Sequence, residues 1–165
     1  MLGMADPSTI YQIVLLLHVA AAIVGFGGLI AHSSYNAKAF GGNAGDARVL
    51  LSTTQLVTKF AHYAIYGVFL LGIVLVAVSE DEVGFDEAWI SASFVVWFLL
   101  VGAAHGLVKP TVGKLLTKAN ELDAETKMTN DPDVVALAKK LALGEGIVQL
   151  MLVVALALMI WQPGA

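Results

Sequence analysis

Ionisable side chains interrupt otherwise apolar stretches of this sequence at His18, His32, His62, His105 and Glu145. Such groups are costly in apolar surroundings, so they usually face a protein interior, where they bind a ligand, relay protons or join helices. Neutral imidazole is a common ligand of metals and haem, and two histidines with one carboxylate form sites for zinc or non-haem iron. These residues therefore indicate a cofactor site, a proton path or polar contacts between helices.

The elements that position these residues are membrane-spanning helices. The chain of 165 residues is 58% hydrophobic and 13% charged, whereas soluble domains are about 45–50% apolar and about 25% charged. A helix needs about 20 apolar residues to cross a bilayer, and only a helix satisfies its own backbone there. We therefore predict a single all-α domain in the lipid bilayer, a transmembrane four-helix bundle with spans at about 9–33, 55–79, 88–108 and 141–161.

The charges around the connections predict the topology. The nine Lys and Arg residues flank the first and third connections, whereas the second, SEDEVGFDE, has five acids and no base. The positive-inside rule then places both termini outside the cytoplasmic membrane, in an up-down-up-down bundle. AFGGNAGDA reads as a turn, and Asp131-Pro132 reads as the start of a helix. We expect the helices to extend beyond the membrane on the cytoplasmic side, with a kink or a restart at Pro110.

Three of the ionisable residues fall at one membrane level. A rise of about 1.5 Å per residue puts His62, His105 and Glu145 each roughly 7–11 Å from the centre of its span, toward the cytoplasm. These residues could bind a divalent metal ion as a two-histidine, one-carboxylate set. With His32 they could instead relay protons. His18 lies close to the midplane, slightly toward the outside.

A stripe on the first span has two interpretations. His18, Gly25 and His32 are spaced by seven residues, with Gly28 beside them. Small residues let membrane helices approach closely, and a histidine can be satisfied by one interhelical hydrogen bond. Alternatively, Gly25 and Gly28 leave room for the flat ring of haem b.

In the haem interpretation, the iron ligands are drawn from the histidines. One arrangement takes two ligands from His32, His62 and His105, and another uses His18 with a different or open sixth position. At the inner border, Lys59 or Lys109 would meet the haem propionates.

The run HVAAAIVGFGG resembles the first helix of a group of small four-span bacterial membrane proteins. The group includes an uncharacterised predicted integral membrane family, and it is similar to the copper-resistance protein D membrane domain and to haem-dependent protoporphyrinogen oxidase. The resemblance rests on His18 and the pair Gly27 and Gly28, and Gly25 stands where the group usually has Trp. It implies a b-type haem bundle with His18 as an axial ligand. It does not imply the oxidase activity, because LIAHSSYNAKAF lacks the Arg of that enzyme's signature.

We therefore expect an integral membrane protein that binds haem b and acts in electron transfer or as a haem-dependent oxidoreductase. One alternative is a protein that binds or transports a metal ion or protons through His62, His105 and Glu145. Another is a cofactor-free accessory subunit of a membrane complex. The glycines allow a homo-oligomer or a larger complex as well as tight internal packing. The few basic residues are interleaved with acids, which argues against a nucleic-acid partner.

Overall fold

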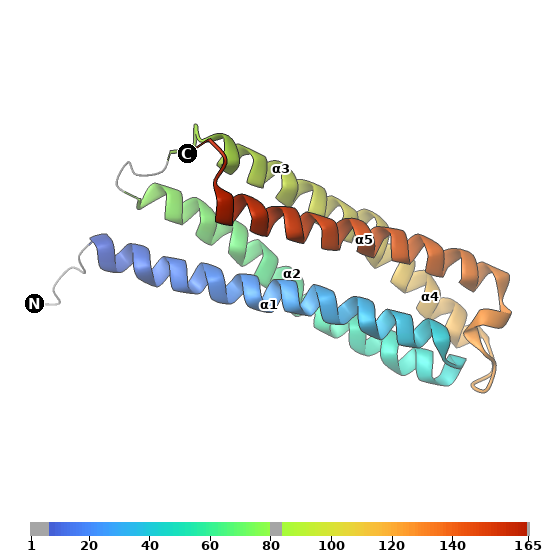
Figure 1. Cartoon of the computed structure of the whole chain (residues 1–165). Helices are drawn as coiled ribbons and strands as arrows, with labels where there is room; N and C mark the ends of the chain where they lie inside the picture. The colour runs from blue at the N-terminus through green and yellow to red at the C-terminus, as the bar shows by residue number, and fades with distance from the viewer. Residues whose placement is uncertain (1–6, 80–83, 165) are drawn as a thin grey trace, which may run out of the picture.

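The structure, a computed structural model, describes residues 7–79 and 84–164. Figure 1 shows long helices packed side by side in alternating directions. The elements are α1 (Pro7–Gly41), α2 (Ala44–Ala77), α3 (Ala88–Ala103), the π-helical turn η1 (Ala104–Val108), α4 (Lys109–Glu121), the 3-10 turn η2 (Met128–Asn130) and α5 (Pro132–Trp161). Because α3, η1 and α4 follow one another without a break, the bundle has four rods, which confirms the predicted all-α four-helix fold.

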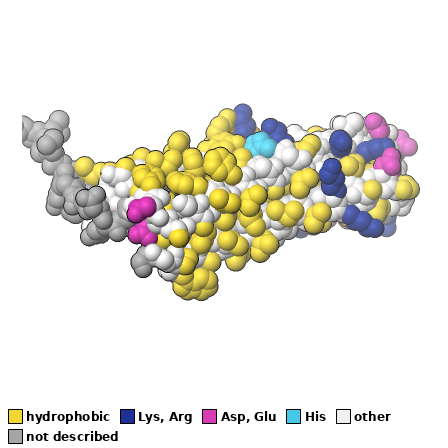
Figure 2. Space-filling model, turned by 90° about the horizontal axis from the view of Figure 1, so that it is seen from above, with side chains coloured by type: hydrophobic (Ala, Val, Ile, Leu, Met, Phe, Trp, Pro, Cys, Tyr) yellow, Lys and Arg dark blue, Asp and Glu magenta, His cyan; other side chains and the backbone are white. Residues whose placement is uncertain are grey.

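Each rod is long and apolar enough to cross a membrane. The candidate spans are Thr9–Gly41, Ala44–Ala77, Ala88–Glu121 and Pro132–Trp161. Large hydrophobic side chains such as Leu16, Ile23 and Leu150 are exposed on the bundle surface. Figure 2 shows hydrophobic side chains over the middle of the molecule and Lys and Arg toward one end. This pattern matches a bundle that is surrounded by lipid along its middle.

The helices extend past the predicted spans at the end where α1 and α4 finish and α2 and α5 begin, which we call the basic end. There the side-chain oxygen of Asn43 accepts a hydrogen bond from the backbone N–H of Asp46 at 2.8 Å and caps α2. Asp131 caps α5 by accepting from Asp133 N–H at 2.8 Å. The turn and the helix start predicted here are confirmed. The opposite end, where α2 leads into α3 and where α5 finishes, we call the far end; residues 80–83 of its acidic connection lie outside the described residues.

Glycines set the approach of α1 to α2. A Cβ built on Gly28 would lie 2.8 Å from the Cβ of Ala61, and one built on Gly25 would lie 2.8 Å from Cδ1 of Ile65. Real Cβ atoms do not come this close, so only glycine allows the two backbones their present separation. The same construction on Gly27 meets nothing within 4 Å. Gly25 and Gly28 therefore serve the close packing of α1 against α2.

The third rod passes Pro110 without restarting. Proline has no N–H to donate to the carbonyl four residues earlier, and its ring crowds that carbonyl. The chain widens into the π-helical turn Ala104–Val108 directly before α4, and Pro110 occupies the first turn of α4. This turn contains His105. A π-helical turn within a longer helix often accompanies a functional position.

Candidate functional site

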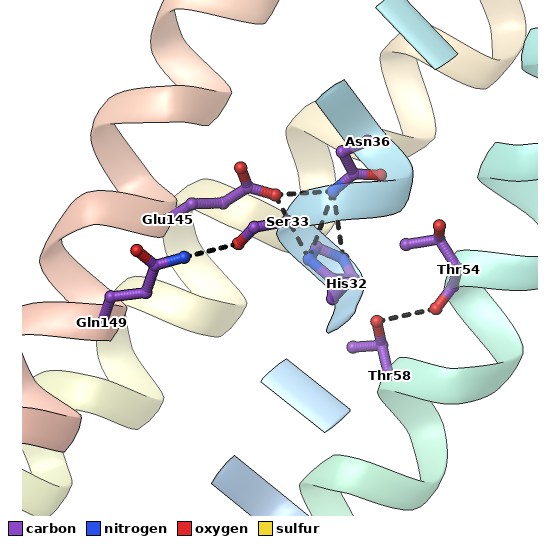
Figure 3. Close-up of polar contacts among 7 residues, drawn as sticks. All are labelled: His32, Ser33, Asn36, Thr54, Thr58, Glu145 and Gln149. Atoms are coloured by element: carbon purple, nitrogen blue, oxygen red, sulfur yellow. Dashed lines mark hydrogen bonds and ion pairs between the residues drawn. The ribbon is translucent and has the colours of Figure 1, made fainter. Parts of the chain in front are cut away.

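A buried carboxylate, an amide and an imidazole meet between α1 and α5 in the half of the bundle toward the basic end (Figure 3). The Nδ2 of Asn36 donates a hydrogen bond to Oε1 of Glu145 at 2.6 Å. The Nδ1 of His32 lies 3.2 Å from the same oxygen and 3.2 Å from Asn36 Nδ2. The side chains of His32 and Glu145 are only 5% and 12% exposed. The three groups therefore lie within hydrogen-bond distance of one another.

A neutral contact joins the same two helices one turn away. Gln149 Nε2 donates to Ser33 Oγ at 2.9 Å. Both residues come one turn or less after members of the buried cluster, so α1 and α5 meet along one polar stripe. The predicted proton relay grouped Glu145 with all of the neighbouring histidines, whereas the side chain that Glu145 contacts directly is His32.

His62 and His105 form a second site between α2 and η1. Their ring centroids are 4.6 Å apart. His105 Nδ1 lies 3.1 Å from the carbonyl oxygen of Val101, and since a carbonyl only accepts, Nδ1 carries the proton. In neutral imidazole, Nε2 then accepts a hydrogen bond from the hydroxyl group of Tyr66, whose oxygen is 3.1 Å away. The predicted common level of His62 and His105 corresponds to a direct ring contact.

The predicted metal set is not assembled in this arrangement. Glu145 faces His32, whereas His105 is held by Tyr66 and Val101. Within residues 7–79 and 84–164, no three His, Asp or Glu side chains come together in a group that could hold a metal ion. A cavity of about 10 Å³ lies between the two sites, with His32, Ser33, Thr58, His62 and Glu145 in its wall.

His18 stands apart, in the half of the bundle toward the far end. It is 8% exposed, and its Nδ1 is buried without a hydrogen-bond partner. It lines an apolar cavity of about 320 Å³ together with side chains from the other three rods, among them Gly72, Phe94 and Met159. A smaller cavity of about 80 Å³ shares these four residues.

Gly72 and Met159 were not among the predicted site residues. A Cβ built on Gly72 would lie 3.4 Å from Cε1 of His18, at van der Waals contact, so Gly72 lies directly beside the imidazole. A glycine in the middle of an apolar span is a signal of such an approach. Nothing in the sequence places Met159 of α5 beside His18 of α1.

The structure bears on two further parts of the haem prediction. The space beside Gly25 and Gly28 is occupied by Ile65 and Ala61 of α2. Lys59 lies 13 residues from Gly72 along α2, which is about 20 Å of helix. A contact of Lys59 or Lys109 with haem propionates stays a prediction.

The four apolar rods with an ionisable interior define a multi-pass integral membrane protein. Residues 12–163 match the family described as a predicted integral membrane protein, DUF2269, and the chain belongs to this family. No curated protein and no solved structure matches the chain. The family membership confirms the predicted link to an uncharacterised integral membrane family. The similarity to the copper-resistance protein D membrane domain and to protoporphyrinogen oxidase stays a prediction.

Proposed function

We propose that this membrane protein binds haem b through His18 in the cavity toward the far end. The observation that carries the proposal is the place of His18 in the wall of an apolar cavity of about 320 Å³, within the range of about 300–1,000 Å³ typical of ligand sites. The ring of His18 makes a hydrogen bond with the backbone of Val68 on α2, while its buried Nδ1 has no partner. An unpaired buried polar atom costs about 1–3 kcal/mol, and a ligand bound at Nδ1 would offset this cost.

The other histidines fit haem less well. His32 is engaged by Asn36 and Glu145, and His105 by Tyr66 and the Val101 carbonyl. His62 lines the cavity of about 10 Å³, which is too small for a macrocycle. The bis-histidine arrangement among these three would require their present contacts to break. His18 therefore supports the proposal alone among the histidines.

Residues around His18 would hold the group by simple means. His18 would supply an imidazole to the iron, with Gly72 directly beside that ring. Phe94 would contribute an apolar wall, and the Met159 thioether in the same wall is a further candidate iron ligand. Bound haem supplies a one-electron redox centre, which suits electron transfer or a haem-dependent oxidoreductase.

The test is the visible spectrum of the full chain, purified in mild detergent after expression with added haem, in oxidised and dithionite-reduced form. We expect a Soret band in the unaltered protein and in His62→Ala, and its loss in His18→Ala. A folded protein without a Soret band, or one that keeps it in His18→Ala, would overturn the proposal. Bound metal without a Soret band would then favour the metal alternative. The absence of both bound metal and a Soret band would favour the cofactor-free accessory subunit.

A further inference from the structure

The cluster of His32, Asn36 and Glu145 can be reached from the basic end. A groove of about 480 Å³ runs between α1, α4 and α5 to this cluster, and its wall includes Asn36, Glu145 and the exposed Lys139. Lys139 precedes Glu145 by six residues, or about 9 Å along the helix. A charged lysine marks the level where the groove meets water. Water therefore has a path to the carboxylate without crossing the apolar middle of the bundle.

The contacts of Glu145 allow a proton to rest on either of two groups. With a proton on His32 Nδ1, the imidazole donates to Glu145 Oε1 across 3.2 Å, and Asn36 donates a second hydrogen bond to the same oxygen at 2.6 Å. With the proton on Glu145 instead, Asn36 Nδ2, which lies 3.2 Å from Nδ1 and 3.4 Å from Nε2 of His32, can donate to the ring nitrogen that is unprotonated. The amide therefore supports both states. A fixed structural link would need only one.

A water-sized space continues the path toward α2. The cavity of about 10 Å³ lies between His32 and Glu145 on one side and His62 on the other, with Ser33 and Thr58 in its wall. Its size is close to the minimum of about 10–15 Å³ for one water, which needs two to four polar partners. His62 Nε2 is buried without a partner. One water would satisfy His62 and join it to the cluster.

We propose that Glu145 and His32 form a buried proton-binding site, loaded from the basic end through this groove and linked to His62 by one water. A proton passes from groove water to the Glu145 carboxylate and on to His32 Nδ1, while the other ring nitrogen of His32 releases a proton to the water, which protonates His62 Nε2. Glu145, His32 and the water each gain one proton and pass one on, His62 keeps the proton, and no electrons move. The titratable groups facing the site are His62 and Tyr66 on α2, His105 on η1, and Lys109 and Lys139.

The site does not depend on haem at His18, and it is not explained by helix joining alone. Gln149 and Ser33 already tie α1 to α5 one turn away with neutral groups. Ionisable residues inside a membrane are costly, and they typically mark proton relays or ion pathways. A Glu and a His at this place therefore indicate proton handling.

The first test is infrared spectroscopy of the full chain in lipid nanodiscs as the pH is changed. We expect the carbonyl band of a protonated carboxyl to appear as the pH is lowered, and this band to be lost in Glu145→Gln. The band should remain in Gln149→Ala, which removes only the neutral tie, and in Glu121→Gln, an exposed carboxylate on α4. Identical spectra for the unaltered protein and Glu145→Gln would overturn the proposal.

A second readout covers the partners of Glu145. In His32→Gln, the carbonyl band of Glu145 should remain, and its pH midpoint should shift. This variant tests the proposal even if Glu145→Gln does not fold. In protein labelled with ¹⁵N-histidine, the His62 signal, assigned through His62→Phe, should titrate together with the Glu145 band and shift in Glu145→Gln. If the pH midpoint of the carbonyl band is unchanged in His32→Gln, Glu145 and His32 do not share a proton. If the His62 signal is unchanged in Glu145→Gln, the water link between the two residues is wrong.

Discussion

At the scale of single residues, the histidines of this protein differ only through their neighbours. His18 lines an apolar cavity, His32 faces a carboxylate, and the His62 ring lies tilted against that of His105. Each begins as the same side chain in an apolar helix, so its chemistry is assigned by the helix that packs against it. The same holds for the glycines of α1, because whether a glycine is needed depends on the side chain of the neighbouring helix that packs against it.

Gly28 and Gly27 provide a matched pair for testing the close packing of α1 against α2. A Cβ on Gly28 would lie 2.8 Å from Ala61 Cβ, whereas one on Gly27 meets nothing within 4 Å. Both Gly→Ala changes gain the same helix propensity, so this contribution cancels in their comparison. We expect Gly28→Ala to be less stable than Gly27→Ala by about 1–3 kcal/mol, measured by denaturant unfolding in detergent.

The partner of Gly28 supplies the control. Adding Ala61→Gly removes the opposing Cβ, so the double variant should regain much of the stability lost in Gly28→Ala beyond what the single changes add up to. Equal stability of Gly28→Ala and Gly27→Ala would show that α1 and α2 separate without cost, and that the glycines do not set their distance.

The sequence predicts the level of each polar residue better than its partner. A constant rise per residue places His62 and His105 at the same depth, and their rings do meet. The same argument assigned Glu145 to this pair, but Glu145 lies against His32 on α1. Depth follows from counting residues, whereas the partner depends on how each helix is rotated and which rods are neighbours. The cavity at His18 escaped prediction for this reason, since its wall combines all four rods.

At the scale of elements, the end of α4 depends on a side chain from α2. Arg48 donates from Nε to the carbonyl of Ala119 at 2.8 Å and from a terminal nitrogen to the carbonyl of Leu122. The last carbonyls of a helix lack partners within it, and the helix dipole favours a cation there. The following loop is bound to the start of α2, where Ala44 and Gly45 donate to the carbonyls of Thr126 and Ala124 at 2.8 and 3.0 Å.

Replacing Arg48 should loosen this end of the bundle. Arg48→Met keeps most of the apolar stem but removes the donors to two carbonyls. Each hydrogen bond to a charged group stabilises a protein by at most about 1.5–3 kcal/mol. We expect faster backbone hydrogen exchange over residues 119–127, with the middle of α1 unchanged. Lys114→Met, at an exposed position on α4, serves as the control. Unchanged exchange in Arg48→Met would show that the backbone contacts of the loop alone hold the end of α4.

At the scale of the whole molecule, the rods share an apolar middle and differ at their ends. The basic end carries the Lys and Arg residues around both of its connections, whereas the connection at the far end is acidic in sequence. The cavity at His18 lies toward the far end, and the groove to Glu145 opens toward the basic end. The two proposed sites are therefore reached from opposite sides of the membrane, and the orientation of the bundle decides which compartment supplies each.

The charge distribution predicts that the basic end faces the cytoplasm and both termini lie outside. The chain has no cysteine, so a single introduced cysteine can be labelled without background. In intact bacterial cells, a membrane-impermeant maleimide should label Gly164→Cys beyond α5, and should label Asp123→Cys, in the loop after α4, only after the cells are permeabilised. Labelling of Asp123→Cys alone in intact cells would reverse the orientation, and the groove to Glu145 would then take protons from outside. Accessibility of both sites in intact cells would contradict an odd number of crossings between them, and with it the four-rod arrangement in the membrane.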